Sequence, residues 1–284
     1  MRFGGSAEEC GNKCSSSLAA LPSLGLTGNI EYASQMNTTI RRWIELDGTR
    51  NCRDLGGIPV KAGVTKFNVL YRSDALNLLS EADQQRVEDL RLSAIIDFRS
   101  DFEIGRAPNR LAPNLSKLVK TRSFLPKSTH ALFDMVNNGE IDAAGVKKYM
   151  CDQYRILTLD HTREYRQVLE DILTANGQAL LYHCTSGKDR TGMISAIILA
   201  AAGADENDII DDYTLTNGRI EPIAYLKKSN DPSIVKHIMA AAPDYMQTAM
   251  RTMRSEFGSV ENYLSKALKL TVDERERLQS LLVE

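Results

Sequence analysis

The segment QALLYHCTSGKDRTGMISAIILAAAG, residues 178–203, decides the fold. Residues 178–183 form a short and mostly apolar run, which is typical of a buried strand. Residues 190–202 are almost entirely apolar and are followed by Gly203, which is typical of a buried helix that ends at a glycine. A strand, a tight loop and a helix in this order predict an α/β fold with a mainly parallel sheet.

The same alternation extends in both directions along the chain. Short apolar runs predict further strands at residues 42–46, 67–71 and 93–98. Capping residues and helical periodicity predict helices after Ser80, over residues 160–175 and after Thr271. These elements indicate one α/β domain with helical additions.

The first 36 residues differ in composition from the rest of the chain. Residues 1–36 are rich in Gly, Ser and Ala and lack a sustained period, which predicts a flexible leader. Residues 37–284 are then expected to form a single domain.

Composition excludes several classes of protein. The 284 residues include 35 Lys plus Arg and 37 Asp plus Glu, a net charge of −2, so we expect no nucleic-acid partner. The longest apolar run, residues 193–202, has about half the length of a membrane-spanning helix, so we expect no integral membrane segment. The five cysteines show no zinc-type pairing. This predicts reduced thiols, no metal or cofactor, and a cytoplasmic location.

Residues 183–192, His-Cys-Thr-Ser-Gly-Lys-Asp-Arg-Thr-Gly, connect the strand to the helix. Such a loop is a natural anion-binding site, because its amides can point inward and the helix dipole adds positive potential. Arg190 can offer a planar fork to two oxygens of a phosphate. In these surroundings the thiolate form of Cys184 is favoured. A thiolate below a tetrahedral anion suits in-line attack on phosphorus and a cysteinyl-phosphate intermediate.

Other interpretations of this loop are weaker. A Walker loop would place Ser or Thr after Lys188, where this chain has Asp189. A cysteine protease fits poorly, because the only histidine near Cys184 directly precedes it and the loop suits an oxyanion. The alternative that stays open is a catalytically silent scaffold that binds phosphorylated ligands, although binding alone needs no thiol.

The pattern His-Cys-x5-Arg-Thr-Gly resembles the phosphate-binding loop of the cysteine-dependent protein tyrosine phosphatases. Its Gly-Lys-Asp-Arg-Thr-Gly form resembles the tyrosine/serine subfamily, which includes protein tyrosine phosphatase B and lipid-phosphatase-like enzymes. The resemblance covers residues 38–284 and implies a three-layer fold around a central, mostly parallel sheet. Further similar blocks are residues 51–57 (NCRDLGG, with Cys52 in place of the usual aromatic), 71–74 (YRSD), 97–100 (DFRS) with Glu103, and 257–264 (FGSVENYL).

Resemblance and loop chemistry together assign roles to the loop. Cys184 is expected to be the nucleophile and Arg190 the phosphate clamp. Thr191 is expected to hydrogen-bond the thiolate and help it leave, and His183 to order the loop backbone. The other residues expected to bind phosphate are Thr185, Ser186, Gly187, Lys188 and Asp189.

The general acid is open between two aspartates. Removal of phosphate from an alcohol needs a proton donor near the leaving oxygen. The resemblance implies this role for Asp189, inside the loop, and equally an acid or loop-supporting role for Asp97, at the end of a strand. Lys188 would favour highly charged substrates such as phosphoinositides if it faced the pocket rather than solvent.

The resemblance also implies supporting residues. Arg53 and Asp54 are expected to brace the wall of the site. Arg99 is expected either to touch substrate or to pair with Glu103.

Two helical segments have less specific patterns. Residues 213–258 carry a stripe of Tyr and Met, which is typical of ordinary core, whereas the resemblance suggests a helical lid over the site. The acidic run 205–212 is expected to be a solvated helix face.

The sequence therefore predicts a phosphatase for phosphotyrosine, and by extension for phosphoserine, phosphothreonine or phosphoinositides. Its expected partner is a phosphorylated protein or a phosphoinositide substrate.

Overall fold

The computed structural model describes residues 41–125, 129–220, 226 and 231–284. The chain divides into two units, Met1–Asn37 and Thr38–Glu284. The predicted leader, residues 1–36, lies outside the described residues, and the following account concerns the second unit.

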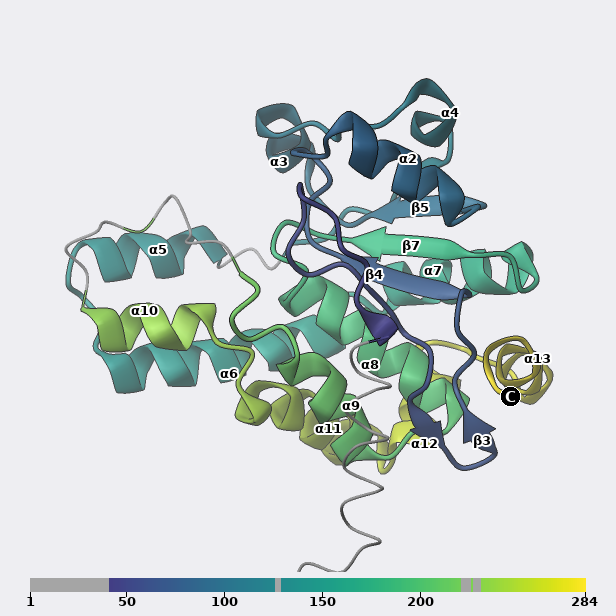
Figure 1. Cartoon of the computed structure of the whole chain (residues 1–284). Helices are drawn as coiled ribbons and strands as arrows, with labels where there is room; N and C mark the ends of the chain where they lie inside the picture. Colours follow the sequence, from purple (N-terminus) through teal and green to yellow (C-terminus); the bar gives the residue numbers. More distant parts are fainter. Residues whose placement is uncertain (1–40, 126–128, 221–225, 227–230) are drawn as a thin grey trace, which may run out of the picture. The chain divides into compact units, whose positions relative to one another are not determined.

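A five-stranded sheet with the order β1-β4-β7-β5-β6 forms the centre of this unit (Figure 1). The neighbours from β4 to β6 pair in parallel, and β1 pairs antiparallel with β4. The predicted mainly parallel sheet is therefore confirmed. Its strands are β1 (Arg53–Asp54), β4 (Leu70–Ser73), β5 (Ala94–Asp97), β6 (Val119–Thr121) and β7 (Leu180–His183), while β2 (Pro59–Val60) and β3 (Gly63–Val64) form a separate antiparallel pair.

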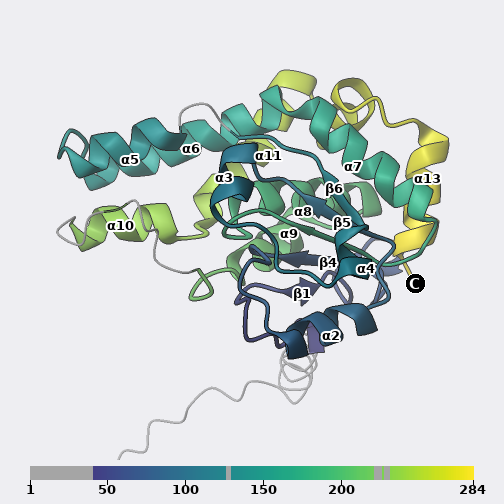
Figure 2. The ribbon, with the colours of Figure 1, turned by 90° about the horizontal axis from the view of Figure 1, so that it is seen from above.

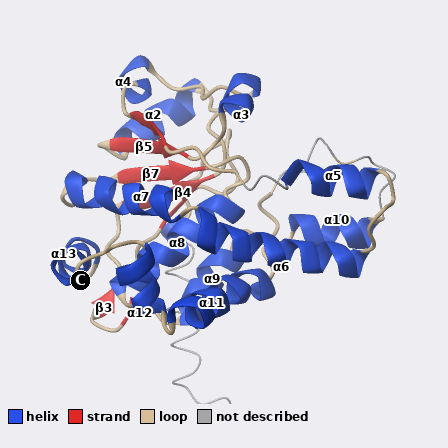
Figure 3. Ribbon diagram, turned by 180° about the vertical axis from the view of Figure 1, so that it is seen from behind, coloured by secondary structure: helices blue, strands red, loops and turns tan. Residues whose placement is uncertain are grey.

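Helices cover both faces of the sheet, which gives three layers (Figures 2 and 3). Side chains alternate along β7: Leu180 and Tyr182 join a large apolar cluster on one face, whereas Leu181 joins a smaller cluster on the other. On the side of the smaller cluster lie α2 (Glu81–Asp89) and α4 (Pro113–Ser116). The larger cluster includes α6 (Ala143–Asp160), α7 (Thr162–Ala175), α8 (Asp189–Ala202), α9 (Glu206–Thr214), α11 (Pro243–Phe257), the π-helical turn η1 (Tyr263–Ala267) and α13 (Val272–Leu282).

The remaining helices lie toward the carboxyl ends of the strands or join larger elements. Helix α3 (Asp101–Arg106) follows β5, and α12 (Val260–Asn262) precedes η1. Helices α5 (Thr129–Asn137) and α10 (Pro232–Met239) lie beside the first part of α6, on the side toward which β7 points (Figures 1 and 3). Of the predicted lid 213–258, residues 221–225 and 227–230 lie outside the described residues.

Local signals in the sequence place the helix ends correctly. Ser80 and Thr271 each form a capping box at the start of a helix. Asn176 ends α7 and Gly203 ends α8, both in the left-handed conformation. All residues of α8 after its first are buried, as the apolar run predicts.

Two predicted strands differ from the structure. The run 67–71 contains Asn68 at φ 64°, which interrupts an extended chain, so β4 begins only at Leu70. The strand predicted at 42–46 is wrong: Trp43 alone forms a bridge, to Arg53. The chain then turns away, because the Asp83 carboxylate binds the N–H groups of the turn at residues 47–48.

Over the part of the chain that the structure describes, no helix combines the length and the apolar character needed to cross a membrane.

Candidate active site

The predicted loop leaves the end of β7 and enters α8, so the sequence itself brings its residues together. Cys184 follows the strand directly and its residue surface is 2% exposed. Arg190 is the second residue of α8. Both therefore lie at the carboxyl edge of a parallel sheet, where ligands of open α/β folds bind.

The carbonyl groups of residues 185–187 are held from outside the loop. The N–H of Ala75 donates to the first of them at 3.0 Å. The amide of Asn51 donates to the second at 3.2 Å and to the third at 3.1 Å, and Arg72 Nη2 donates to the third at 2.9 Å. Because C=O and N–H point in opposite directions in a trans peptide, this anchoring turns the following N–H groups inward. The loop therefore has the form of an anion-binding nest.

Gly187 is required at the centre of this loop. Its φ of +65° lies in the left-handed region, and a Cβ atom there would come within 2.8 Å of the Asn51 amide and of the backbone of residues 73–74. A larger residue would thus push away the donors that hold the loop carbonyls.

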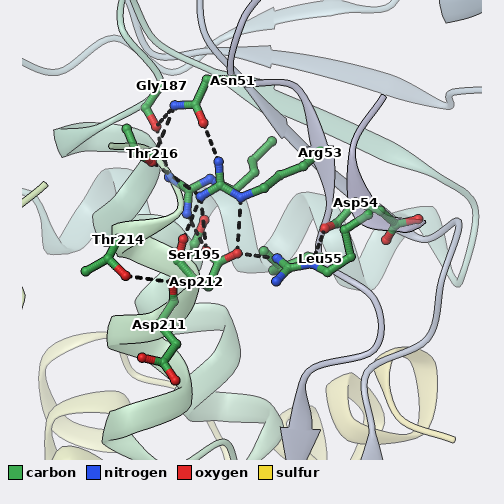
Figure 4. Close-up of polar contacts among 12 residues, drawn as sticks. Asn51, Arg53, Asp54, Leu55, Gly187, Ser195, Asp211, Asp212, Thr214 and Thr216 are labelled. Carbon is green, nitrogen blue, oxygen red and sulfur yellow. Dashed lines mark hydrogen bonds and ion pairs between the residues drawn. The ribbon is translucent and has the colours of Figure 1, made fainter. Parts of the chain in front are cut away.

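A buried network of charges stands behind those donors. The Asp212 carboxylate of α9 accepts from Arg72 Nη1 at 2.5 Å, from Arg53 Nε at 3.2 Å, and from Arg42. Arg53 also donates to the side-chain oxygen of Asn51. Figure 4 shows the side chains of Asn51, Arg53 and Asp212 converging on one another. One aspartate thus holds three arginines, and two members of the network contact the loop directly.

The interpretation of residues 205–212 as a solvated face is wrong for Asp212 alone among the acidic residues, since the others are exposed or half-buried. The Asp212 residue surface is 2% exposed, whereas its neighbour Asp211 is exposed and its carboxylate points away from the arginines (Figure 4). Burial alone would raise the pKa of Asp212, but the charges of Arg53 and Arg72 outweigh it and hold that pKa well below its usual range. Asp212 is therefore ionised whenever the protein is folded at ordinary pH.

Arg190 has a bidentate partner in Glu103 of α3. Its Nη1 and Nη2 lie 2.8 and 2.6 Å from the two carboxylate oxygens, and Nη1 also donates to the carbonyl of Phe98 at 3.1 Å. The Thr185 hydroxyl donates to the same carboxylate at 2.5 Å. Burial would raise the pKa of Glu103, but its hydrogen bonds with Arg190 and the cationic charge lower the pKa to about 2. The suggested pairing of Arg99 with Glu103 is wrong, because Arg190 takes this carboxylate.

Asp97 lies in a separate buried cluster. Arg99 binds both of its oxygens, through Nε at 3.0 Å and Nη2 at 2.7 Å, and Asn109 donates to it at 3.0 Å. These contacts outweigh burial and lower the pKa of Asp97. His183 Nε2 lies 3.6 Å from the same carboxylate, and burial lowers the pKa of this histidine to about 4. At neutral pH the cluster therefore holds an ionised aspartate and a neutral imidazole.

Lys188 points away from solvent. Its amino group donates to the carbonyls of Ile238 and Ala240 at the end of α10, the second at 3.4 Å, and lies 3.4 Å from Asp189 Oδ1. The interpretation of Lys188 as a surface lysine is therefore wrong.

The remaining two loop residues with predicted roles in proton transfer or thiolate release, Thr191 and Asp189, differ in whether their side chains have a hydrogen-bond partner. The hydroxyl of Thr191 is buried and has no hydrogen-bond partner among the described residues. A buried hydroxyl without a partner costs about 1–3 kcal/mol, so this hydroxyl is free to bond another group. The Asp189 side chain is 32% exposed and accepts a hydrogen bond from Tyr154 at 2.8 Å.

Arg53 and Asp54 are neighbours in β1, but their side chains have different roles. Arg53 belongs to the charge network described above. The Asp54 carboxylate accepts from the N–H groups of Gly56 and Asn68, both at 2.7 Å, and so fixes a turn rather than the loop.

The sequence did not reveal the roles of Asp212, Asn51, Arg72 and Tyr154. The similar blocks 51–57 and 71–74 contain two of these residues and were a usable signal. Asp212 lies in an acidic run and Tyr154 in an ordinary amphipathic helix, so neither has a local signature.

Comparisons with known proteins show which family the chain is similar to. Residues 44–284 match the family model described as the tyrosine phosphatase family. A Cupriavidus necator protein named as a tyrosine-protein phosphatase is 29% identical over 254 residues, covering 82% of this chain and 86% of its own length. The triple specificity protein phosphatase PtpB of Mycobacterium tuberculosis is 26% identical over 259 residues, covering 78% of this chain and 93% of its own. Among solved structures, P. aeruginosa TpbA in complex with pTyr has 16% identity and a TM-score of 0.33, covering 74% of this chain and 96% of its own.

Proposed function

The chain belongs to the tyrosine phosphatase family and is a phosphoric monoester hydrolase, and on that premise we propose that it cleaves phosphotyrosine through a cysteinyl-phosphate on Cys184. One observation carries this proposal: the loop that follows Cys184 has its carbonyls held from outside by Ala75, Asn51 and Arg72. Its N–H groups are left for the oxygens of a phosphate.

In the first step, Cys184 Sγ attacks phosphorus, an S–P bond forms and the P–O bond to the tyrosine oxygen breaks. Arg190 binds two of the phosphoryl oxygens, and the inward amides stabilise the charge that develops there. For this the guanidinium exchanges contacts with Glu103 for contacts with phosphate. In the second step water attacks phosphorus, the P–S bond breaks, and phosphate and the thiolate are released.

We assign the proton transfer to Asp189. It lies inside the loop with a partly exposed carboxylate, whereas Asp97 is buried and is bound at both oxygens by Arg99. Asp189 protonates the leaving tyrosine oxygen in the first step and accepts a proton from water in the second. Thr191, whose hydroxyl has no other partner in the described part of the chain, stabilises the thiolate as it leaves. Asp97 and His183 then support the loop rather than move protons.

We extend the proposal to the lid and to a wider range of substrates. Helix α10 contacts Lys188 through its last carbonyls, so movement of this helix would free a second cation beside the phosphate site. A freed Lys188 would bind additional phosphates, as in phosphoinositides. Phosphoserine and phosphothreonine need the same steps with a poorer leaving group.

Hydrolysis of para-nitrophenyl phosphate tests the proposal, with wild type beside Cys184→Ser at pH 5–7 in the presence of EDTA and a thiol reductant. We expect turnover by the wild type, its loss in the variant, and retained binding of tungstate by the variant. Equal turnover by both proteins would exclude the cysteine mechanism. Tungstate binding without turnover by the folded, reduced wild type would favour the silent scaffold. Phosphopeptides and phosphoinositide vesicles, compared next, test the substrate range.

A further inference from the structure

Two buried tyrosines form a hydrogen-bonded chain that ends on Asp189. Tyr154 of α6 donates to Asp189 Oδ1 at 2.8 Å, and its hydroxyl lies 2.6 Å from that of Tyr213 of α9. Since Tyr154 has one hydroxyl proton and gives it to Asp189, Tyr213 is the donor in the second bond. The chain therefore runs in one direction, from α9 through α6 to the loop.

The two hydrogen-bonded tyrosines are tightly packed, and their hydroxyl groups stay protonated. Tyr154 is fully buried and Tyr213 is 1% exposed, and their rings meet edge to face with centroids 5.9 Å apart. Burial, followed by the charge of Asp189, raises the pKa of both hydroxyls well above the usual value. Neither tyrosine therefore ionises over the working pH range, and both remain donors.

Gly192 provides the space for this chain. A Cβ atom at that position would lie 2.9 Å from Cδ2 of the Tyr213 ring. The glycine that closes the Arg-Thr-Gly pattern thus lets the tyrosine pack directly against α8.

We propose that Tyr154 is a positioning residue for Asp189, with Tyr213 acting behind it. The Tyr154 hydroxyl fixes the carboxylate through Oδ1, to which Lys188 also lies within 3.4 Å. Oδ2 accepts no hydrogen bond from any described residue, so it is the oxygen left to carry the proton to the leaving group. This inference rests on the proposed function, because it assigns a purpose to an aspartate of that site.

The other groups around Asp189 do not replace this contact. Arg190 is the next residue and is bound to Glu103. Tyr245 of α11 packs against Tyr154 with ring centroids 5.7 Å apart, but its hydroxyl donates to the carbonyl of His237. Among these neighbours Tyr154 alone donates a hydroxyl proton to the carboxylate.

The test is the dependence of kcat/KM on the leaving group in the full-length protein. We compare phenyl phosphate, whose leaving group needs a proton, with 2,4-dinitrophenyl phosphate, whose leaving group does not. Tyr154→Phe is expected to lower kcat/KM about 10-fold for phenyl phosphate and only about 2-fold for the dinitrophenyl ester. The larger loss is a part of the roughly 10²–10⁴-fold that general acid catalysis contributes. Tyr213→Phe is expected to give a smaller change with the same preference.

The pH profile gives a second readout. If Asp189 is the general acid, we expect activity to fall at high pH, where no proton is available for the leaving group. Tyr154→Phe removes a hydrogen bond from the ionised carboxylate, so this form becomes less stable and the alkaline limb moves to higher pH. A purely structural role would lower the whole profile without moving the limb.

Tyr165→Phe is the matched control, because it removes a buried hydroxyl whose 2.8 Å bond goes to the carbonyl of Leu157. The inference is overturned if Tyr154→Phe and Tyr165→Phe share the wild-type ratio between the two esters and the wild-type alkaline limb. The proposed function would survive that result. Its own failure is separate, since it would appear as absence of Cys184-dependent turnover in the wild type.

Discussion

The two sides of the phosphate-binding loop are held by different kinds of partner. Behind the loop, Asn51 and Arg72 bind its carbonyls, and Asp212 holds Arg72 in place, all of them almost completely buried. In front, Glu103 holds Arg190, and the end of α10 holds Lys188.

The partners behind the loop therefore form a fixed frame, whereas the contacts in front of it can be exchanged for contacts with a substrate. Two of the rear partners, Arg72 and Asp212, are buried ions, and removal of either leaves the other without compensation. The front partners are carboxylate and carbonyl oxygens, which satisfy the same cations that a phosphate would bind. A substrate can therefore replace the contacts in front while the frame behind stays intact.

Of the changes that test this difference, Asp212→Asn should have the largest effect on stability. It leaves three buried arginines without their anion, which we expect to lower the free energy of unfolding by about 3–5 kcal/mol. Chemical denaturation measures the loss. Asp211→Asn, next to it on the exposed face, should lie within about 0.5 kcal/mol of wild type. Equal losses in the two variants would show that the rear network is not a buried charge frame.

Glu103→Gln should have a smaller effect that depends on pH. The pKa of Glu103 is about 2 in the folded protein, below its usual 4.5. A lowered pKa adds stability above the unfolded value, and this stability is lost as pH falls toward 2. Wild type should therefore exceed the variant by about 1–3 kcal/mol at pH 6, and the gap should shrink steadily toward pH 3. Unfolding free energies across this range measure the gap.

The control for Glu103 is Asp101→Asn, an exposed change in the same helical turn. A gap between wild type and Glu103→Gln that stays constant from pH 6 to pH 3, or that Asp101→Asn reproduces, would contradict the ion pair in front of the loop.

Lys188→Met should have the smallest effect and should sharpen the comparison. It keeps most of the length of the side chain but leaves the carbonyls at the end of α10 without their donor. We expect amide hydrogen exchange in residues 232–240 to become about five-fold faster, equivalent to about 1 kcal/mol of local stability. Lys236→Met, an exposed change on α10, should leave exchange unchanged. Unaltered exchange in Lys188→Met would mean that α10 is held by other contacts.

Prediction from sequence succeeded where the relevant interactions are local. The strand, loop and helix around Cys184 follow from a continuous run of residues, and the capping boxes at Ser80 and Thr271 span only four positions each. The predicted loop residues lie together in the structure for the same reason, because chain connectivity alone brings them together.

Prediction failed where a charged side chain forms an ion pair with a residue far away in the sequence. Asp212 has an ordinary acidic context, yet it binds arginines from the first strands. Glu103 has Arg99 four positions earlier, but the fold brings Arg190 to it instead. Helical spacing cannot show such choices, because they depend on which elements meet at the carboxyl edge of the sheet.

The frame behind the loop also has a consequence for how the protein acquires activity as it folds. Arg42 and Asp212 are separated by 170 positions along the chain, and Asn51 and Gly187 by 136. Contacts of such long range close large loops of chain and tend to form slowly. The loop around Cys184 can gain its strand and helix early, but its amides turn inward only when the first strands and α9 have met. We therefore expect catalytic activity in a refolding experiment to return after most of the helical signal, so that it reports the last stage of folding.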